Sequence, residues 1–199
     1  VLLQACISLA RLHAAGVHKT LSVNVSPRQF RADDFVAQVR QTLADTGAPA
    51  HALVFEVTEG LLIDHVDDTV ARMAELVAMG IRFSIDDFGT GYSSMTYLQR
   101  LPLYEIKIDK GFVHDVPGGA GNAAIVRAIL SMASHLRLRV VAEGVETAGQ
   151  AEFLCASGCE ALQGYHFARP VPLAQWLQAA LAAAGSAQPH AHRVPGLVP

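Results

Sequence analysis

The sequence predicts an α/β fold of the TIM-like (β/α) barrel type, incomplete at its N-terminus. Six short apolar runs alternate with stretches of helical spacing, the pattern of repeated βα units with parallel strands. Every run ends on, or just before, a polar residue. All strand C-termini of a parallel barrel meet at one face, so these polar groups are expected to converge on one pocket. The six runs are residues 21–25, 53–57, 82–86, 104–108, 138–142 and 159–163.

Between the runs, the apolar spacing predicts the helices. Ser26-Pro27 opens one helix that is expected to continue to about Leu43, because proline is favoured in the first helical turn. Val66, Met73 and Val77 fall on one side of another, which Gly80 ends as a C-cap. The remaining helices are expected near residues 2–12, 94–100, 122–136, 148–156 and 173–184.

Length and composition fit one globular domain with a sizeable core. The chain has 199 residues, of which 51% are hydrophobic and 17% charged, and this balance excludes a disordered protein. A net charge of −3 gives no general attraction to nucleic acid, so we expect neither DNA nor RNA as a partner. No apolar run reaches the roughly 18 residues of a membrane span. Three cysteines without a metal-site spacing are expected to be reduced thiols, consistent with the cytoplasm.

Six strand–helix units are visible where a closed barrel of this type has eight strands. The chain also begins with Val1, inside a helical pattern. We therefore interpret residues 1–184 as an N-terminally truncated domain of a longer polypeptide, with two strands upstream. Residues 185–199 mix Ser, Gln, Pro, His and Gly, and are expected to form a disordered tail or linker.

Asp86 and Asp87 close the third run and give the sharpest chemical signal. Neighbouring side chains on a regular strand point to opposite faces, so both carboxylates serve one site only where the backbone turns. Gly89 and Gly91 follow at once, and glycine permits such turns. Two adjacent anions raise each other's proton affinity unless a cation is present, so we expect a divalent metal pair here rather than a solvated loop.

Asn24 and Glu56 end the first two runs, and their oxygens suit Mg²⁺ or Mn²⁺ better than zinc or copper. Asn24 alone would equally fit a turn. Lys107, between two isoleucines, is either an edge residue that reaches solvent or a cation that orients a nucleophilic water and offsets phosphate charge. Glu143 and Glu146 repeat the pattern of carboxylates at a strand end. None of the nine histidines is assigned a catalytic role.

Several sequence blocks resemble the EAL-domain cyclic di-GMP phosphodiesterases, in unbroken order over about residues 1–178. The blocks are VNVSPRQF at 23–30, FEVTE at 55–59, IDDFGTGYSS at 85–94, YLQRLP at 97–102, IKID at 106–109, VAEGVET at 141–147 and QGY at 163–165.

The resemblance implies a barrel that uses two Mg²⁺ or Mn²⁺ ions to hydrolyse cyclic di-GMP to linear pGpG. It implies bacterial signalling that governs biofilm formation and motility. Carried over position by position, it assigns the metal ligands Asn24, Glu56, Asp86 and Asp87, with Asp86 as the bridge. Lys107 and Glu143 would position or activate the attacking water, and Glu59 would brace the loop at residues 86–94. Glu146, Gln163 and Asp109 would contact the substrate.

The same resemblance implies a homodimer through the loop at residues 86–94. It also implies an upstream sensory or diguanylate-cyclase (GGDEF) module, in a parent protein that is cytoplasmic or tethered to the inner membrane. The glutamate of the Glu-Ala-Leu motif, a metal ligand in the family, is expected upstream of this chain. Glu160-Ala161-Leu162 is a coincidence of letters, since it precedes Gln163 in a late strand.

Two alternatives remain open. A non-catalytic receptor or signalling scaffold of the same fold would bind cyclic di-GMP without cleaving it, and a generic metal-dependent hydrolase would act on another substrate. Degenerate members of the family normally lose metal ligands or the lysine, whereas Asp86, Asp87 and Lys107 are present here. The intact set favours the enzyme.

Overall fold

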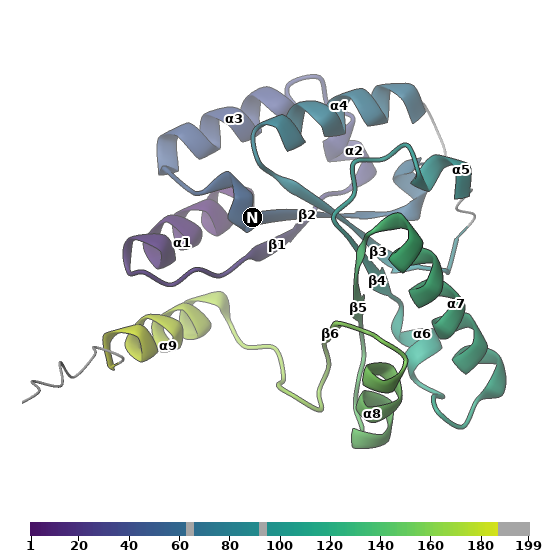
Figure 1. Ribbon diagram of the computed structural model, residues 1–199. Coiled ribbons are helices and arrows are strands. Elements are labelled where there is room, and N and C mark those ends of the chain that lie inside the picture. Colours follow the sequence, from purple (N-terminus) through teal and green to yellow (C-terminus); the bar gives the residue numbers. More distant parts are fainter. Residues whose placement is uncertain (63–65, 92–94, 187–199) are drawn as a thin grey trace, which may run out of the picture.

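The computed structural model describes residues 1–62, 66–91 and 95–186, and its centre is one six-stranded parallel sheet. The strands lie side by side in chain order, and together they form a half-barrel (Figure 1). This confirms the predicted fold class. The strands are β1 (Leu21–Asn24), β2 (Leu53–Thr58), β3 (Arg82–Phe88), β4 (Glu105–Ile108), β5 (Arg139–Ala142) and β6 (Ala161–Leu162).

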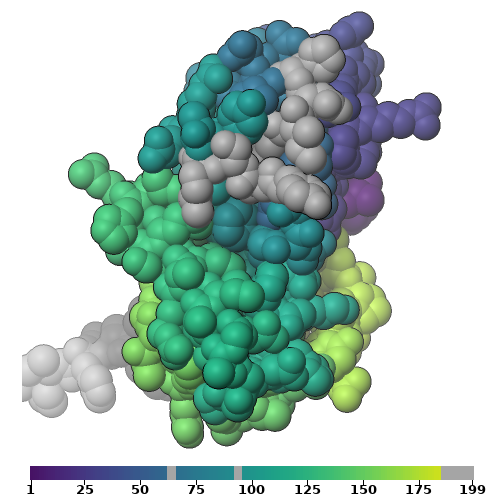
Figure 2. All heavy atoms as spheres, turned by 90° about the vertical axis from the view of Figure 1, so that its right-hand side faces the viewer, coloured from purple at the N-terminus to yellow at the C-terminus, as the bar shows by residue number. Residues whose placement is uncertain are grey.

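Helices connect consecutive strands and cover the outer side of the sheet. In Figure 1, α3 and α4 lie over β1–β3, whereas α7 and α8 lie beside β4–β6. Figure 2 turns the right-hand side of Figure 1 toward the viewer, and the green segment around α7 lies at the surface there. The helices are α1 (Leu2–Ala14), α2 (Pro27–Phe30), α3 (Phe35–Thr46), α4 (Val66–Ala78), α5 (Met95–Leu98), α6 (Lys110–Val113), α7 (Ala120–Leu136), α8 (Ala148–Ala156) and α9 (Leu173–Ser186), with 3-10 turns η1 (Ala50–Ala52) and η2 (Glu59–Leu62).

The outer face of the sheet carries the core, and four phenylalanines are its centre. Phe55 and Phe83, on adjacent strands, have ring centroids 5.9 Å apart, and both side chains are fully buried. Phe35 packs against Phe55 at 5.8 Å, and Phe30 packs against Phe83 at 6.1 Å. Phe30 and Phe35 complete the group at 5.8 Å. Their burial fixes which side of β2 and β3 faces the helices, so the alternate residues face the barrel interior.

Those alternate positions carry polar groups. Ser84 on β3 donates a hydrogen bond to Glu105 on β4 at 3.2 Å, and Arg139 on β5 lies 3.5 Å from the other Glu105 oxygen. Burial raises the pKa of the Glu105 carboxyl, while Ser84 and Arg139 oppose that effect. Glu105 lies two residues before Lys107 on β4, so this polar layer lies next to the layer in which the candidate site is found, on the same face of the sheet.

Several predicted boundaries were wrong. The helix expected from Ser26 to Leu43 is divided into α2 and α3, because the Arg72 guanidinium donates to the carbonyl oxygens of Phe30 and Ala32 and fixes a turn there. The short helix α6 was not predicted, and β3 continues past Asp86 to Phe88. The last strand is shorter than expected, so Gln163 lies just beyond it.

The three cysteines are free thiols, as expected. Within the described ranges, none of the helices combines the length and apolar character that a membrane crossing requires. Helix α9 continues to Ser186, and the rest of the predicted tail, residues 187–199, lies outside the described residues.

Candidate metal and substrate site

The C-terminal ends of the strands gather the polar residues that the sequence analysis singled out. Strand register places Asn24 beside Glu56, and Thr58 beside Asp86. Lys107 on β4 is paired with Val141 on β5, two positions before Glu143. The parallel arrangement therefore brings side chains from β1 to β5 to one edge, as predicted.

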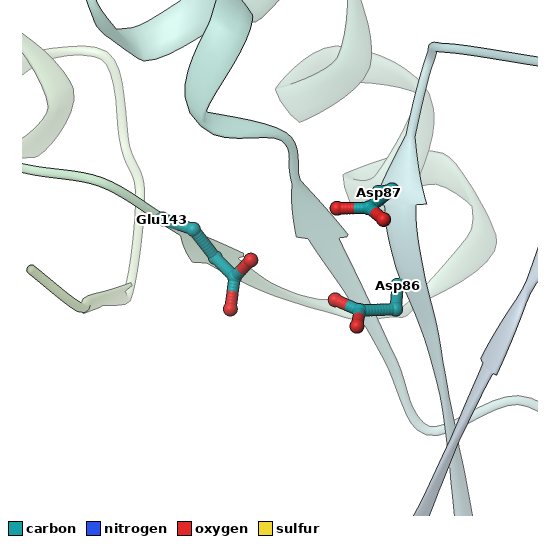
Figure 3. A group of neighbouring side chains, drawn as sticks. All are labelled: Asp86, Asp87 and Glu143. Atoms are coloured by element: carbon teal, nitrogen blue, oxygen red, sulfur yellow. The ribbon is translucent and has the colours of Figure 1, made fainter. Parts of the chain in front are cut away.

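A bulge lets both aspartates serve this edge. The β3–β4 register shifts between Ile85 and Phe88, and Asp87 has a φ of 53°, in the left-handed region. Such backbone costs a non-glycine residue on the order of 1–2 kcal/mol, and it is a feature of functional sites. With this turn inside the strand, Asp86 and Asp87 both extend toward Glu143 (Figure 3).

Lys107 is the cation at the centre of the site. Its Nζ lies 2.7 Å from Glu143 Oε1, 2.9 Å from Asp86 Oδ1 and 3.1 Å from Glu56 Oε1. The lysine side chain is only 7% exposed, so these are largely desolvated ion pairs. Of the two readings of Lys107, the edge residue that reaches solvent is therefore wrong, since its ammonium points into the carboxylate cluster.

Burial and charge shift the pKa values of Lys107, Glu143 and Asp87. Burial by itself lowers the pKa of Lys107, but hydrogen bonds to Asp86 and Glu143 outweigh this effect and hold the pKa well above its ordinary value. Burial raises the pKa of the Glu143 carboxyl, although Lys107 opposes the rise. Burial and then the neighbouring Asp86 and Asp109 carboxylates raise the pKa of Asp87. Lys107 is thus a fixed positive charge beside Glu143, whose carboxyl holds a proton more readily than usual because its pKa is raised.

A divalent cation fits the same carboxylates. Asp86, Asp87 and Glu143 each offer an oxygen, and these oxygens all lie within 4.8 Å of one another. Carboxylate oxygens are the ligands that Mg²⁺ and Mn²⁺ prefer. The sequence analysis expected Glu143 to act on the attacking water. Its position in this group makes it a potential metal ligand as well. Glu56 is not in this group, although its Oε1 contacts Lys107, which also contacts Asp86 and Glu143.

A cavity of about 340 Å³ opens next to the carboxylates. Gly144 and Gly164 form part of its wall, and neither position tolerates a side chain. Gly144 has a φ of 69°, and an added Cβ would lie 2.5 Å from Lys110 Cβ; at Gly164 it would lie 2.1 Å from the Val145 carbonyl oxygen. The lining residues are Asp87, Asp109, Lys110, Glu143, Gly144, Glu146, Gln163, Gly164 and Tyr165.

All three predicted substrate-contact residues, Glu146, Gln163 and Asp109, line this cavity. Asp109 also caps α6, because its Oδ1 accepts a hydrogen bond from the Gly111 N–H at 2.8 Å. Two lining residues were missed. Tyr165 is 54% exposed, with the Arg169 guanidinium 4.7 Å from its ring centroid, and Lys110 begins the unpredicted helix α6. An aromatic residue beside Gln163 was the signal that could have identified Tyr165.

Glu59 lies against the loop that follows Asp87. The buried carboxylate accepts a hydrogen bond from the Gly89 N–H at 2.6 Å, and its Oε2 would be 2.8 Å from a Cβ added at Gly91. This contact agrees with the bracing position expected of Glu59. Residues 92–94, the end of the loop expected at a dimer interface, lie outside the described residues.

Gln150 was also missed, although Thr147 and Gln150 form a capping box that the sequence pattern could have revealed. The Gln150 side chain accepts hydrogen bonds from the N–H groups of Glu146 and Thr147, at 2.8 and 2.9 Å. It donates to the His114 carbonyl oxygen at 2.9 Å. This buried residue therefore ties the cavity wall at residues 143–147 to the end of α6.

We expect Gln150→Leu to lower the free energy of unfolding by about 2–3 kcal/mol, because it leaves two N–H donors and one carbonyl unsatisfied. Chemical denaturation measures the change. Gln29→Leu is the matched control, since Gln29 occupies the equivalent position of the exposed capping box at Ser26 and α2, and a loss of about 1 kcal/mol or less is expected there. Equal losses at the two positions would contradict the role given to Gln150.

The comparisons with known proteins all point to the same family. The EAL domain family matches residues 1–170. Cyclic di-GMP phosphodiesterase NbdA of Pseudomonas aeruginosa is 46% identical over 176 residues, which cover 87% of this chain and 22% of that protein. This chain thus spans about a fifth of the length of that relative.

Two solved structures share the fold and were determined with cyclic di-GMP. The PaMucR phosphodiesterase in a c-di-GMP complex superimposes with a TM-score of 0.83 at 42% identity, over 88% of this chain and 71% of that one. Klebsiella pneumoniae BlrP1, in a manganese/cy-diGMP complex, gives a TM-score of 0.76 at 30% identity, over 84% of this chain and 42% of that one.

Proposed function

This chain belongs to the EAL domain family, and on that premise we propose that it hydrolyses one phosphodiester bond of cyclic di-GMP to give linear pGpG. The observation that carries the proposal is the convergence of Asp86, Asp87 and Glu143 oxygens within 4.8 Å of one another beside a cavity, with the Lys107 ammonium paired to Asp86 and Glu143. The named relatives include a cyclic di-GMP phosphodiesterase and structures with this nucleotide.

Asp86 and Asp87 would hold Mg²⁺ or Mn²⁺ together with Asn24 and Glu56, and the geometry offers Glu143 as a further ligand. Bound metal would supply Lewis-acid stabilisation of the attacking and leaving oxygens of the phosphodiester. Because the phosphate is anionic and the site is rich in carboxylates, repulsion would otherwise keep the two apart.

Lys107 stays protonated, since its pKa lies above the ordinary value. It therefore acts as a hydrogen-bond donor and positive charge that orients the attacking water and offsets charge on the phosphate, and not as a base. The proton of that water would pass to the Glu143 carboxylate, whose pKa is raised by burial. Glu59 holds the Gly89 backbone, and through it the position of Asp87.

The substrate would enter the cavity beside these groups. Gln163 offers both donors and acceptors to a guanine edge, and Tyr165 offers an exposed ring for base stacking. Glu146 and Asp109 would receive N–H groups of the base or hydroxyls of the ribose. In a bacterial cell this reaction would lower the second messenger that governs biofilm formation and motility. Dimerisation through residues 86–94 and control by an upstream sensory or GGDEF module remain parts of the proposal.

The test is a product assay. Cyclic di-GMP and Mn²⁺ are incubated with the purified 199-residue chain and, in parallel, with a longer natural polypeptide that contains it, and chromatography follows pGpG. We expect pGpG to accumulate only with the divalent metal, and chelation to stop it. If a folded protein binds cyclic di-GMP in both forms but never cleaves it, the receptor alternative replaces the enzyme.

A further inference from the structure

A second cavity lies at the opposite end of the half-barrel, where the chain enters β1, β2 and β3. Its volume is about 200 Å³. Five side chains with basic nitrogens line it, and they come from α1, the loop before β1, η1 and the first residue of β3. We refer to these five residues as the base cluster: His13, His18, Lys19, His51 and Arg82. Leu9, Val17 and Ala52 are among the apolar residues that complete the wall.

No carboxylate lines this cavity. Within the described ranges, neither Lys19 nor Arg82 forms an ion pair with an acidic residue. The Arg82 guanidinium lies 4.6 Å from the centroid of the Tyr104 ring, a contact that orients the side chain and leaves its positive charge uncompensated. In a chain of net charge −3, this concentration of basic groups contrasts with the carboxylates at the other end.

Local structure explains only one member of the cluster. His13 lies in the last turn of α1, where a basic side chain complements the helix dipole. Lys19, His51 and Arg82 come from three separate segments, so no single helix end explains why all three lie at this cavity. Lys19 and Arg82 are like charges from separate segments, and an anion bound between them would offset their mutual repulsion.

A metal ion does not explain the histidines. His13 and His18 lie edge to face, with ring centroids 5.1 Å apart. In the part of the chain that the structure describes, the only group of three or more His, Cys, Asp or Glu ligand atoms close enough for one ion is Asp86, Asp87 and Glu143. Imidazole N–H groups can instead donate hydrogen bonds to an anion, alongside the arginine and lysine donors.

We propose that the base cluster binds one phosphate group, either inorganic phosphate or the phosphoryl end of a small phosphomonoester. The planar Arg82 guanidinium can donate to two phosphate oxygens, and Lys19 supplies a point charge. A cavity of about 200 Å³ is smaller than most sites for drug-sized ligands, roughly 300–1,000 Å³, so it fits a phosphate group and excludes a whole dinucleotide. The site is separate from the proposed phosphodiesterase site and does not depend on it.

Calorimetric titration with inorganic phosphate and, separately, with phenyl phosphate tests the proposal. Chelator is present throughout, so that no divalent metal recruits phosphate to the carboxylate site. The comparison is between the unaltered chain and the Lys19→Gln/Arg82→Gln double variant, in which binding is expected to weaken about tenfold or more, the loss typical of removing charged hydrogen bonds. Tighter binding of phenyl phosphate identifies an ester as the ligand, and tighter binding of inorganic phosphate identifies the free ion.

Arg40→Gln is the matched control, because Arg40 is an exposed cation on α3 away from this cavity. It removes one positive charge and is expected to leave phosphate binding unchanged. Should the double variant fail to fold, His51→Gln replaces it, since that side chain is exposed. Binding that is undetectable in the unaltered chain, or that falls equally in Arg40→Gln, overturns the proposal.

Discussion

Lys107→Met is expected to reduce cyclic di-GMP hydrolysis by about 100-fold or more while strengthening the binding of Mn²⁺. Methionine keeps most of the volume of the side chain and removes the ammonium, which competes with a metal for Glu56, Asp86 and Glu143. The rate is expected to fall because the substitution removes the proposed hydrogen-bond donor to the phosphate and the attacking water. Without the ammonium, the three converging carboxylates repel one another, and this is expected to lower the free energy of unfolding of the metal-free protein by about 3 kcal/mol.

Turnover assays, Mn²⁺ titration and denaturation with and without metal measure the three effects of Lys107→Met. Arg40→Met, which removes an exposed cation on α3, is the control, and it should change none of them appreciably. Near-normal turnover in Lys107→Met would remove the lysine from the proposed reaction. Weaker Mn²⁺ binding would show that the ammonium and the metal occupy the site together.

Asp86→Asn is expected to abolish turnover, with a loss of about 1,000-fold or more, through the opposite change in charge. The substitution preserves shape but removes one carboxylate from the metal group and from the contacts of Lys107. Metal binding weakens, because an amide oxygen is a poorer ligand than a carboxylate. The metal-free protein changes little in stability, because Lys107 keeps its pairs with Glu56 and Glu143. Mn²⁺ titration and denaturation therefore distinguish it from Lys107→Met.

Asp45→Asn provides the matched control for Asp86→Asn. Asp45 is exposed on α3, and its carboxylate accepts a local hydrogen bond from Gln41 at 2.6 Å. Turnover and metal binding are expected to stay unchanged in this variant. If Asp86→Asn turned over substrate at a comparable rate, the two-metal assignment centred on Asp86 would be untenable.

The strands and their convergence could be predicted because they depend on local pattern. Apolar runs such as residues 53–57 are short, lie between helical stretches, and end on charged residues, and a parallel sheet leaves few other arrangements. The positions of Asn24, Glu56, Asp86 and Lys107 follow directly from that register.

The missed features depend on contacts between distant residues or on unusual backbone. The break between α2 and α3 requires Arg72, some 40 residues further along the chain, to bind two carbonyl groups. A backbone turn at the two aspartates was expected from the glycines that follow, but its form, a bulge inside a strand that continues to Phe88, was not predicted. The proximity of Glu143 to both aspartates depends on that bulge as much as on its own strand.

The order of the strands also bears on how the protein is made. Each strand pairs with the one synthesised immediately before it, from β1 to β6, so a nascent chain can add βα units one at a time to a sheet that has already formed. Asp86 and Lys107 leave the ribosome well before Glu143, and Gln163 follows last. The candidate substrate pocket is therefore completed only when the last strand and the residues after it, including Gln163, have emerged from the ribosome.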